Sequence, residues 1–150
     1  MRKILGIAGP TGVGKSRLGM TLAEKMGTDI ISADSAQIYI GMDIGTAKPD
    51  REEQNRVRHH LIDIVRPDEE NFNAFAFSKA AETVINENTY KQPLIVGGTG
   101  LYFETLFYGL DFSVTEETFK IRKEFLRKIR RRRALRKAFG GGSRKRKKRA

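Results

Sequence analysis

The segment GPTGVGKS, residues 9–16, is the feature that most constrains how this chain can fold. It follows the apolar run ILGIA and has the spacing G-x-x-x-x-G-K-S, in which backbone N–H groups converge on an anion at the start of a helix. The pattern requires a buried strand before the loop and a helix after it. We therefore predict a parallel strand at residues 3–8, a phosphate-binding loop, and a helix over Lys15–Met26 that ends at Gly27.

Strand and helix patterns alternate along the rest of residues 1–112. Short apolar runs predict strands, and apolar residues at helical spacing predict helices. The predicted strands are DIISAD (29–34), HHLIDIV (59–65) and QPLIVGG (92–98), and the predicted helices are NAFAFSKAAETVINENT (73–89) and GLYFETLFYGL (100–110). Residues 35–50 contain two glycines and a proline, which indicates an ordered loop with one helical turn. The alternation predicts an α/β fold, a P-loop NTPase-like parallel sheet flanked by helices.

Three segments directly follow predicted strands: GPTGVGKS, SADSAQIY and GGTGLY. The carboxyl ends of parallel strands lie at one edge of a sheet, where open α/β folds bind their ligands. We therefore expect these three segments to meet in one crevice, although about 90 residues of chain separate the first from the last.

Composition and length exclude several classes of protein. The chain has 150 residues, about the size of one domain, and no cysteine, so it has neither disulfides nor thiolate zinc sites. Its longest apolar run is far shorter than the roughly 20 residues needed to cross a bilayer. We expect a cytoplasmic protein without membrane contact, and a monomer.

The net charge of +11 comes from the C-terminal part of the chain. Residues 1–126 hold 15 Lys and Arg against all 18 Asp and Glu, whereas residues 127–150 hold the other 14 basic residues and no acid. We predict three parts, listed in order as a partial catalytic core at 1–112, a basic helical segment at 113–139 and a disordered polybasic tail at 140–150.

The segments ISADSAQIYIGMDIGTAKP, HHLIDI and PLIVGGTGLYFETLFYGL, taken with the phosphate loop, resemble the tRNA dimethylallyltransferases of the isopentenyltransferase family. The resemblance implies that the loop holds the diphosphate of dimethylallyl diphosphate rather than ATP. It implies transfer of the dimethylallyl group to the exocyclic N6 amine of the adenosine that is 3′-adjacent to the anticodon in tRNA. Diphosphate is the leaving group.

The candidate diphosphate-binding residues are Gly9, Pro10, Thr11, Gly12, Val13, Gly14, Lys15 and Ser16. Lys15 is expected to place its ammonium against phosphate oxygens, and Ser16 to offer its hydroxyl to Mg²⁺, the one expected cofactor. An adenine amine is a poor nucleophile, so a base that removes its proton helps the attack. The resemblance implies that Asp34 is this base and that Thr99 orients the amine.

The same resemblance implies the tRNA-binding residues Asp34, Ser35, Ala36, Gln37, Thr99 and Arg122. Gln37 offers a donor and an acceptor to a base edge, and Tyr39 offers a ring for stacking. His59 and His60 are interpreted as structural because no third metal ligand is in sight. A role for Asp63 stays open. The phenylalanines at 72, 75 and 77 are interpreted as helix packing.

The resemblance implies that residues 113–139 could begin the helical insertion by which the family grips the anticodon stem-loop. The acid-free tail after residue 126, however, shows no recognised motif of the family. Three explanations stay open, in this order: a frameshifted or prematurely ended reading of a longer gene, a polybasic RNA-binding arm, and a nuclear-localisation tract. Three other functions also stay open: prenylation of free adenine nucleotides, a small P-loop kinase that uses ATP, and an inactive phosphate- and RNA-binding fragment.

Overall fold

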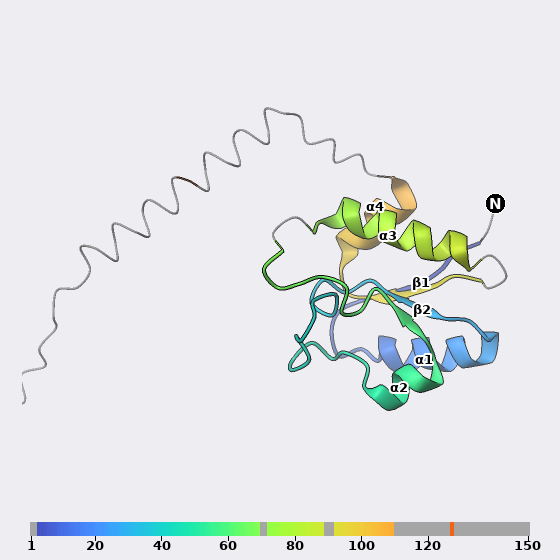
Figure 1. Ribbon diagram of the computed structural model, residues 1–150. Coiled ribbons are helices and arrows are strands. Elements are labelled where there is room, and N and C mark those ends of the chain that lie inside the picture. Colours follow the sequence, from blue (N-terminus) through green and yellow to red (C-terminus); the bar gives the residue numbers. More distant parts are fainter. Residues whose placement is uncertain (1–2, 70–71, 89–91, 110–126, 128–150) are drawn as a thin grey trace, which may run out of the picture. The chain divides into compact units, whose positions relative to one another are not determined.

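A parallel sheet of four strands carries the fold (Figure 1). The computed structural model describes residues 3–69, 72–88, 92–109 and 127. The strands lie in the order β1 (Leu5–Ala8), β4 (Leu94–Gly97), β2 (Ile30–Ser32) and β3 (His59–His60), and each pairs in parallel with its neighbours. The α/β class with a parallel sheet flanked by helices, predicted from the sequence, is confirmed.

Helices cover both faces of this sheet (Figure 1). On one face, α1 (Lys15–Met26) buries Met20 and Ala23 against β4 and β2, and α2 (Arg51–Arg56) lies nearby. On the other face, α3 (Ala74–Glu87) and α4 (Gly100–Tyr108) pack together over a second cluster that contains Phe77, which is fully buried. Among residues 3–69, 72–88 and 92–109, no helix is long and apolar enough to span a membrane.

The short helix α2 is not predicted from the sequence, and its composition explains why. None of its residues is buried, so it shows no apolar periodicity. A capping box starts it: the Glu53 N–H donates to Asp50 Oδ1 at 2.8 Å, and the Asp50 N–H donates to Glu53 Oε2 at 3.1 Å. The spacing D-x-x-E was the signal that could have revealed the helix.

Two other local predictions need correction. The predicted strand 59–65 is paired only at His59–His60, because Leu61 and Asp63 have positive φ angles of 61° and 54°, which interrupt the extended backbone. Pairing returns at a single parallel bridge between Tyr39 and Val65. The loop 35–50 forms turns without the predicted helical turn.

The chain divides into two units, Met1–Asp111 and Phe112–Ala150. The first holds all the strands and helices named above. In the second, Arg127 is the residue described, and it is exposed. The predicted parts 113–139 and 140–150, and the candidate residue Arg122, otherwise fall outside the described residues.

Candidate active site

Three loops meet at the carboxyl edge of the sheet, as predicted. The Ala33 N–H after β2 donates to the Val96 carbonyl at 2.8 Å, and the Thr99 N–H after β4 donates to the Ala33 carbonyl at 3.1 Å. A Cβ at Gly98 would lie 3.6 Å from the Gly9 carbonyl oxygen and 3.9 Å from Lys15 Nζ. The phosphate loop therefore borders the turn after β4, which in turn borders the segment that begins at Asp34.

The phosphate loop has the backbone that its glycines permit. Gly12 and Gly14 have φ angles of 86° and 87°, a conformation that strains residues with a Cβ. Gly14 is the N-cap of α1, and no side chain caps the N–H groups of the first turn. The Lys15 ammonium donates to the Pro10 carbonyl at 2.6 Å, and Ser16 is exposed. The loop thus presents backbone donors, an ammonium and a hydroxyl at one place.

Asp34 and Thr99 lie on neighbouring loops that are tied together by Ser35. The Ser35 N–H donates to Thr99 Oγ1 at 2.9 Å, and the Thr99 hydroxyl donates to Ser35 Oγ at 3.2 Å. Asp34 is partly buried, and its Oδ1 accepts from the N–H of Ala36 at 2.9 Å and of Gln37 at 3.4 Å. Both of these bonds go to Oδ1 of the carboxylate, so the turn is held by this one oxygen of Asp34.

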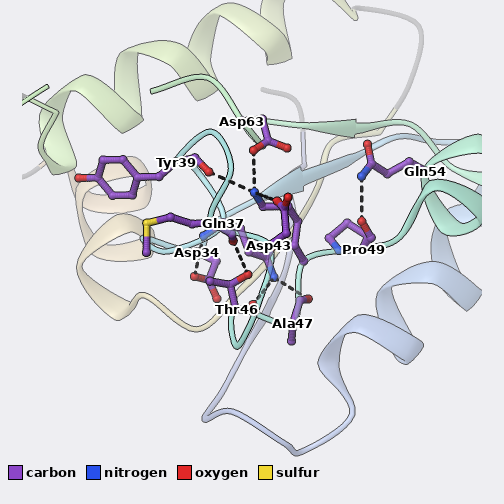
Figure 2. A network of polar contacts seen from close by, with 11 residues as sticks. Asp34, Gln37, Tyr39, Asp43, Thr46, Ala47, Pro49, Gln54 and Asp63 are labelled. Atoms are coloured by element: carbon purple, nitrogen blue, oxygen red, sulfur yellow. Dashed lines mark hydrogen bonds and ion pairs between the residues drawn. The ribbon is translucent and has the colours of Figure 1, made fainter. Parts of the chain in front are cut away.

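Gln37 is buried and uses its amide within the chain. Its Oε1 accepts from the Ser32 hydroxyl at 2.9 Å, and its Nε2 donates to the carbonyls of Thr46 at 3.1 Å and Ala47 at 2.9 Å. The side chain therefore holds residues 46–47 against the end of β2 (Figure 2). Recognition of a base edge by Gln37 would require these bonds to be exchanged, and it stays a prediction.

A buried cation lies beside this loop. The Lys48 ammonium donates to Asp63 Oδ1 at 2.6 Å, to Asp43 Oδ1 at 2.7 Å and to the Tyr39 carbonyl at 3.1 Å, and the side chain is 5% exposed. Burial lowers the pKa of Lys48, but the two carboxylates outweigh burial and raise this pKa above its ordinary value of 10.5. Asp63, whose role stayed open in the sequence, is thus one anchor of the Lys48 ammonium.

Two aromatic rings stack in the core cluster that α3 and α4 cover. The rings of Phe77 and Tyr102 stack at 4.0 Å with an interplanar angle of 8°. Burial, together with the smaller effects of the nearby Tyr39 and Asp34, raises the pKa of Tyr102 to about 12, so its hydroxyl stays protonated at neutral pH. Phe72 and Phe77 pack in the core as predicted, whereas Phe75 is exposed.

The two histidines make structural contacts. His59 Nδ1–H donates to the Val57 carbonyl at 2.8 Å, and His60 Nε2–H donates to Asp29 Oδ2 at 3.0 Å. Within the part of the chain that the structure describes, no three His, Cys, Asp or Glu residues gather to hold a metal ion. The interpretation of His59 and His60 as structural agrees with these contacts.

Acid is expected to destabilise the protein partly through His59. Burial lowers the pKa of His59 below its ordinary value of 6.5, outweighing the bond to Val57 and the charge of Glu53. The unfolded chain therefore binds this proton more readily. The contribution of neutral His59 to the free energy of unfolding is fully present above pH 6.5. It is lost as the pH falls toward the lower folded-state pKa, by about 1.4 kcal/mol per unit of difference between the two pKa values.

Urea unfolding of the protein and of His59→Gln, from neutral pH down to about pH 5, measures this contribution. The variant should lose less stability than the parent protein over that range. Equal pH dependence of the two proteins would contradict the assignment.

Comparisons with known proteins identify the family. The family model described as IPP transferase matches residues 37–140. A tRNA dimethylallyltransferase from Alkaliphilus oremlandii is 48% identical over 123 residues, which cover 81% of this chain and 39% of that protein. The full-length tRNA isopentenylpyrophosphate transferase from Bacillus halodurans superposes with a TM-score of 0.70 at 42% identity, over 75% of this chain and 38% of that one.

A eukaryotic dimethylallyltransferase described as acting on tRNA superposes with a TM-score of 0.66 at 37% identity, over 71% of this chain and 27% of that one. The chain thus spans about two fifths of the length of the bacterial relatives named above. The family match extends over more than half of this chain and includes Gln37, Lys48, Asp63 and Thr99. The chain belongs to the IPP transferase family, in agreement with the resemblance seen in its sequence.

Proposed function

We propose that this chain forms the catalytic core that transfers a dimethylallyl group from dimethylallyl diphosphate to the N6 amine of the adenosine 3′-adjacent to the anticodon in tRNA. One observation carries the proposal: the phosphate loop and the pair Asp34 and Thr99 meet at the same edge of the sheet. The relatives named tRNA dimethylallyltransferase support the same reaction.

The diphosphate side of the proposed site lies at residues 9–16. The uncapped N–H groups of the first turn of α1 and the Lys15 ammonium are donors for phosphate oxygens. The exposed Ser16 hydroxyl is a suitable ligand for Mg²⁺, because this ion binds oxygen atoms. Substrate phosphates and water would supply the other oxygen ligands. When bound, the ion neutralises charge on the leaving diphosphate.

On the acceptor side, Asp34 would take the proton of the N6 amine on the carboxylate oxygen that is not engaged in the turn. The amine nitrogen forms a bond to C1 of the dimethylallyl group, and the bond from C1 to the diphosphate oxygen breaks. The diphosphate leaves with the electron pair. Thr99, held by Ser35, would orient the amine for this attack.

The test is an incubation of the chain with radiolabelled dimethylallyl diphosphate and Mg²⁺, with unmodified tRNA, AMP or no acceptor. Label in the tRNA supports the proposal. Label in AMP alone would replace it with prenylation of free adenine nucleotides. ATP hydrolysis or phosphate transfer without any prenyl product would favour a P-loop kinase. Absence of product from every acceptor would refute catalysis by this chain. It would favour the hypothesis of an inactive fragment that binds phosphate and RNA.

Lys15→Met is expected to weaken binding of inorganic pyrophosphate about 10- to 100-fold, because a hydrogen bond to a charged group is worth about 1.5–3 kcal/mol. The methionine keeps the length of the side chain and removes its charge and donors. Isothermal titration calorimetry measures the dissociation constant. As a control, Lys79→Met removes an exposed lysine on α3 that pairs with Glu82, and it should bind pyrophosphate as the parent does. Equal affinity of all three proteins would contradict the assignment of Lys15.

A further inference from the structure

We propose that Lys48 is a positioning residue for the acceptor side of the site: through Asp43, Asp63 and the Tyr39 carbonyl it fixes the loop whose first residues hold Asp34 beside Thr99. The inference rests on the proposed function for its catalytic consequence. Its structural part is tested independently of that function.

The ammonium of Lys48 has all its hydrogen-bonding capacity in use. An ammonium carries three donors, and Lys48 directs them at Asp63, Asp43 and the Tyr39 carbonyl, at 2.6, 2.7 and 3.1 Å. The side chain is 5% exposed, whereas Asp43 is 68% exposed and Asp63 is 40% exposed. The cation is therefore the buried centre of the cluster, and the two carboxylates reach it from the surface.

The contacts of Lys48 join two segments that are distant in sequence. Asp43 and Tyr39 belong to the loop after β2, and Asp63 belongs to the turn after β3. Main-chain bonds join the same segments: the Ile64 N–H donates to the Ile38 carbonyl, and the Ile40 N–H donates to the Val65 carbonyl, both at 2.9 Å. The ion cluster therefore adds side-chain contacts to the main-chain bonds that already join the two segments.

The backbone next to the cluster is held in a conformation that a free chain avoids. Ala47, which precedes Lys48, has a φ of 48°, and Asp63 has a φ of 54°. Residues with a Cβ keep such angles only where their surroundings impose them. The Gln37 amide binds the Ala47 carbonyl, and Lys48 binds the Asp63 carboxylate, so both strained positions are tied down by side chains.

Removing the cation turns the attraction within the cluster into repulsion between its two carboxylates. Without Lys48, the carboxylates of Asp43 and Asp63 face each other without a counter-charge, and the Tyr39 carbonyl loses its donor. Removing Asp43 or Asp63 alone leaves the ammonium one carboxylate. The effects are therefore expected to decrease from Lys48→Met to Asp63→Asn to Asp43→Asn.

The loop leads directly back to the proposed base. Oδ1 of Asp34 accepts from the N–H groups of Ala36 and Gln37, and the Ser35 N–H donates to Thr99 Oγ1. These three N–H groups report whether Asp34 stays beside Thr99. The phosphate loop is built on β1 and α1 instead, so release of the Lys48 loop should leave diphosphate binding intact.

The experiment compares Lys48→Met with the control Lys79→Met by hydrogen exchange, read by NMR for each amide. We expect the amides of Ser35, Ala36 and Gln37 to exchange at least about tenfold faster in Lys48→Met, while the β4 amides keep their protection. If Lys48→Met does not fold, Asp63→Asn replaces it in this experiment. Asparagine tolerates the positive φ at this position, and Lys48 retains its ion pair with Asp43. Unchanged exchange at residues 35–37 overturns the proposal, whether or not the parent chain transfers label.

A second readout separates positioning from general stability. If the parent chain transfers label, Lys48→Met should lower kcat by about 10- to 100-fold, the size expected when a reacting group is displaced by about 1 Å. The affinity for inorganic pyrophosphate should stay within about twofold of the parent. Faster exchange with an unchanged kcat would overturn the role of Lys48 in the reaction. Absence of label with the parent chain would refute the proposed function alone, since the exchange at residues 35–37 still decides how Asp34 is held.

Discussion

Asp34→Asn is expected to lower the rate of dimethylallyl transfer to tRNA by about 10²- to 10⁴-fold, the range in which general bases contribute. Asparagine keeps an oxygen that accepts from the Ala36 and Gln37 N–H groups, so the turn at Asp34 should persist. It replaces the other carboxylate oxygen, the proposed acceptor of the amine proton, with an amide nitrogen that cannot accept it. The loss should therefore fall on the chemical step and spare the architecture of the site.

The measurement is a single-turnover assay with labelled dimethylallyl diphosphate, together with calorimetry of pyrophosphate binding. Pyrophosphate affinity should stay unchanged, because Asp34 lies on a different loop from residues 9–16. Asp68→Asn is the matched control, since Asp68 is 77% exposed and pairs only with the equally exposed Arg66 in the described structure. A rate for Asp34→Asn within a few fold of the parent would remove Asp34 from the role of base.

The strands and main helices could be predicted because their local signals and their tertiary environments agree. The strands β2 and β4, with the sequences IIS and LIVG, are mostly apolar and buried at every residue, as expected for strands covered on both faces. The bounds Lys15–Met26 and the end of α1 at Gly27 are confirmed, and Gly27 has the left-handed φ of 59° typical of that position. The helix α2 was missed because it buries nothing.

Only the part of the site that follows from the sheet topology could be predicted from the sequence. In a parallel sheet, motifs that follow β1, β2 and β4 must meet at one edge, so the sequence alone predicts that residues 9–16 lie near Asp34 and Thr99. The partners of Gln37 and Lys48 depend on the path of residues 35–48, which have no periodic pattern. The positive φ angle of 54° at Asp63 also could not be predicted, because aspartate adopts such angles more often than most residues but still in only a minority of cases.

Gly97→Ala is expected to destabilise the protein by about 3 kcal/mol or more, the upper range for steric overpacking in a core. A Cβ at this position would overlap the carbonyl oxygen and the carbonyl carbon of Ala33, both of which are backbone atoms. Neither atom can move away by a rotamer change, as a side-chain atom could. The Ala33 N–H is bonded to Val96 and the Ala33 carbonyl to the Thr99 N–H, so making room for a methyl group must break the bonds that join β2 to the turn after β4.

Urea unfolding measures the change, with Gly100→Ala as the control three residues away. A Cβ at Gly100 would meet no atom within 4 Å, and the residue begins α4, so alanine there should leave stability unchanged or raise it by up to about 1 kcal/mol. A Gly97→Ala protein as stable as Gly100→Ala would mean that β2 and β4 can separate without cost. The close packing of Gly97 against Ala33 would then not be needed to keep the loop after β2 beside the turn after β4, which the bonds of Ser35 with Thr99 also join.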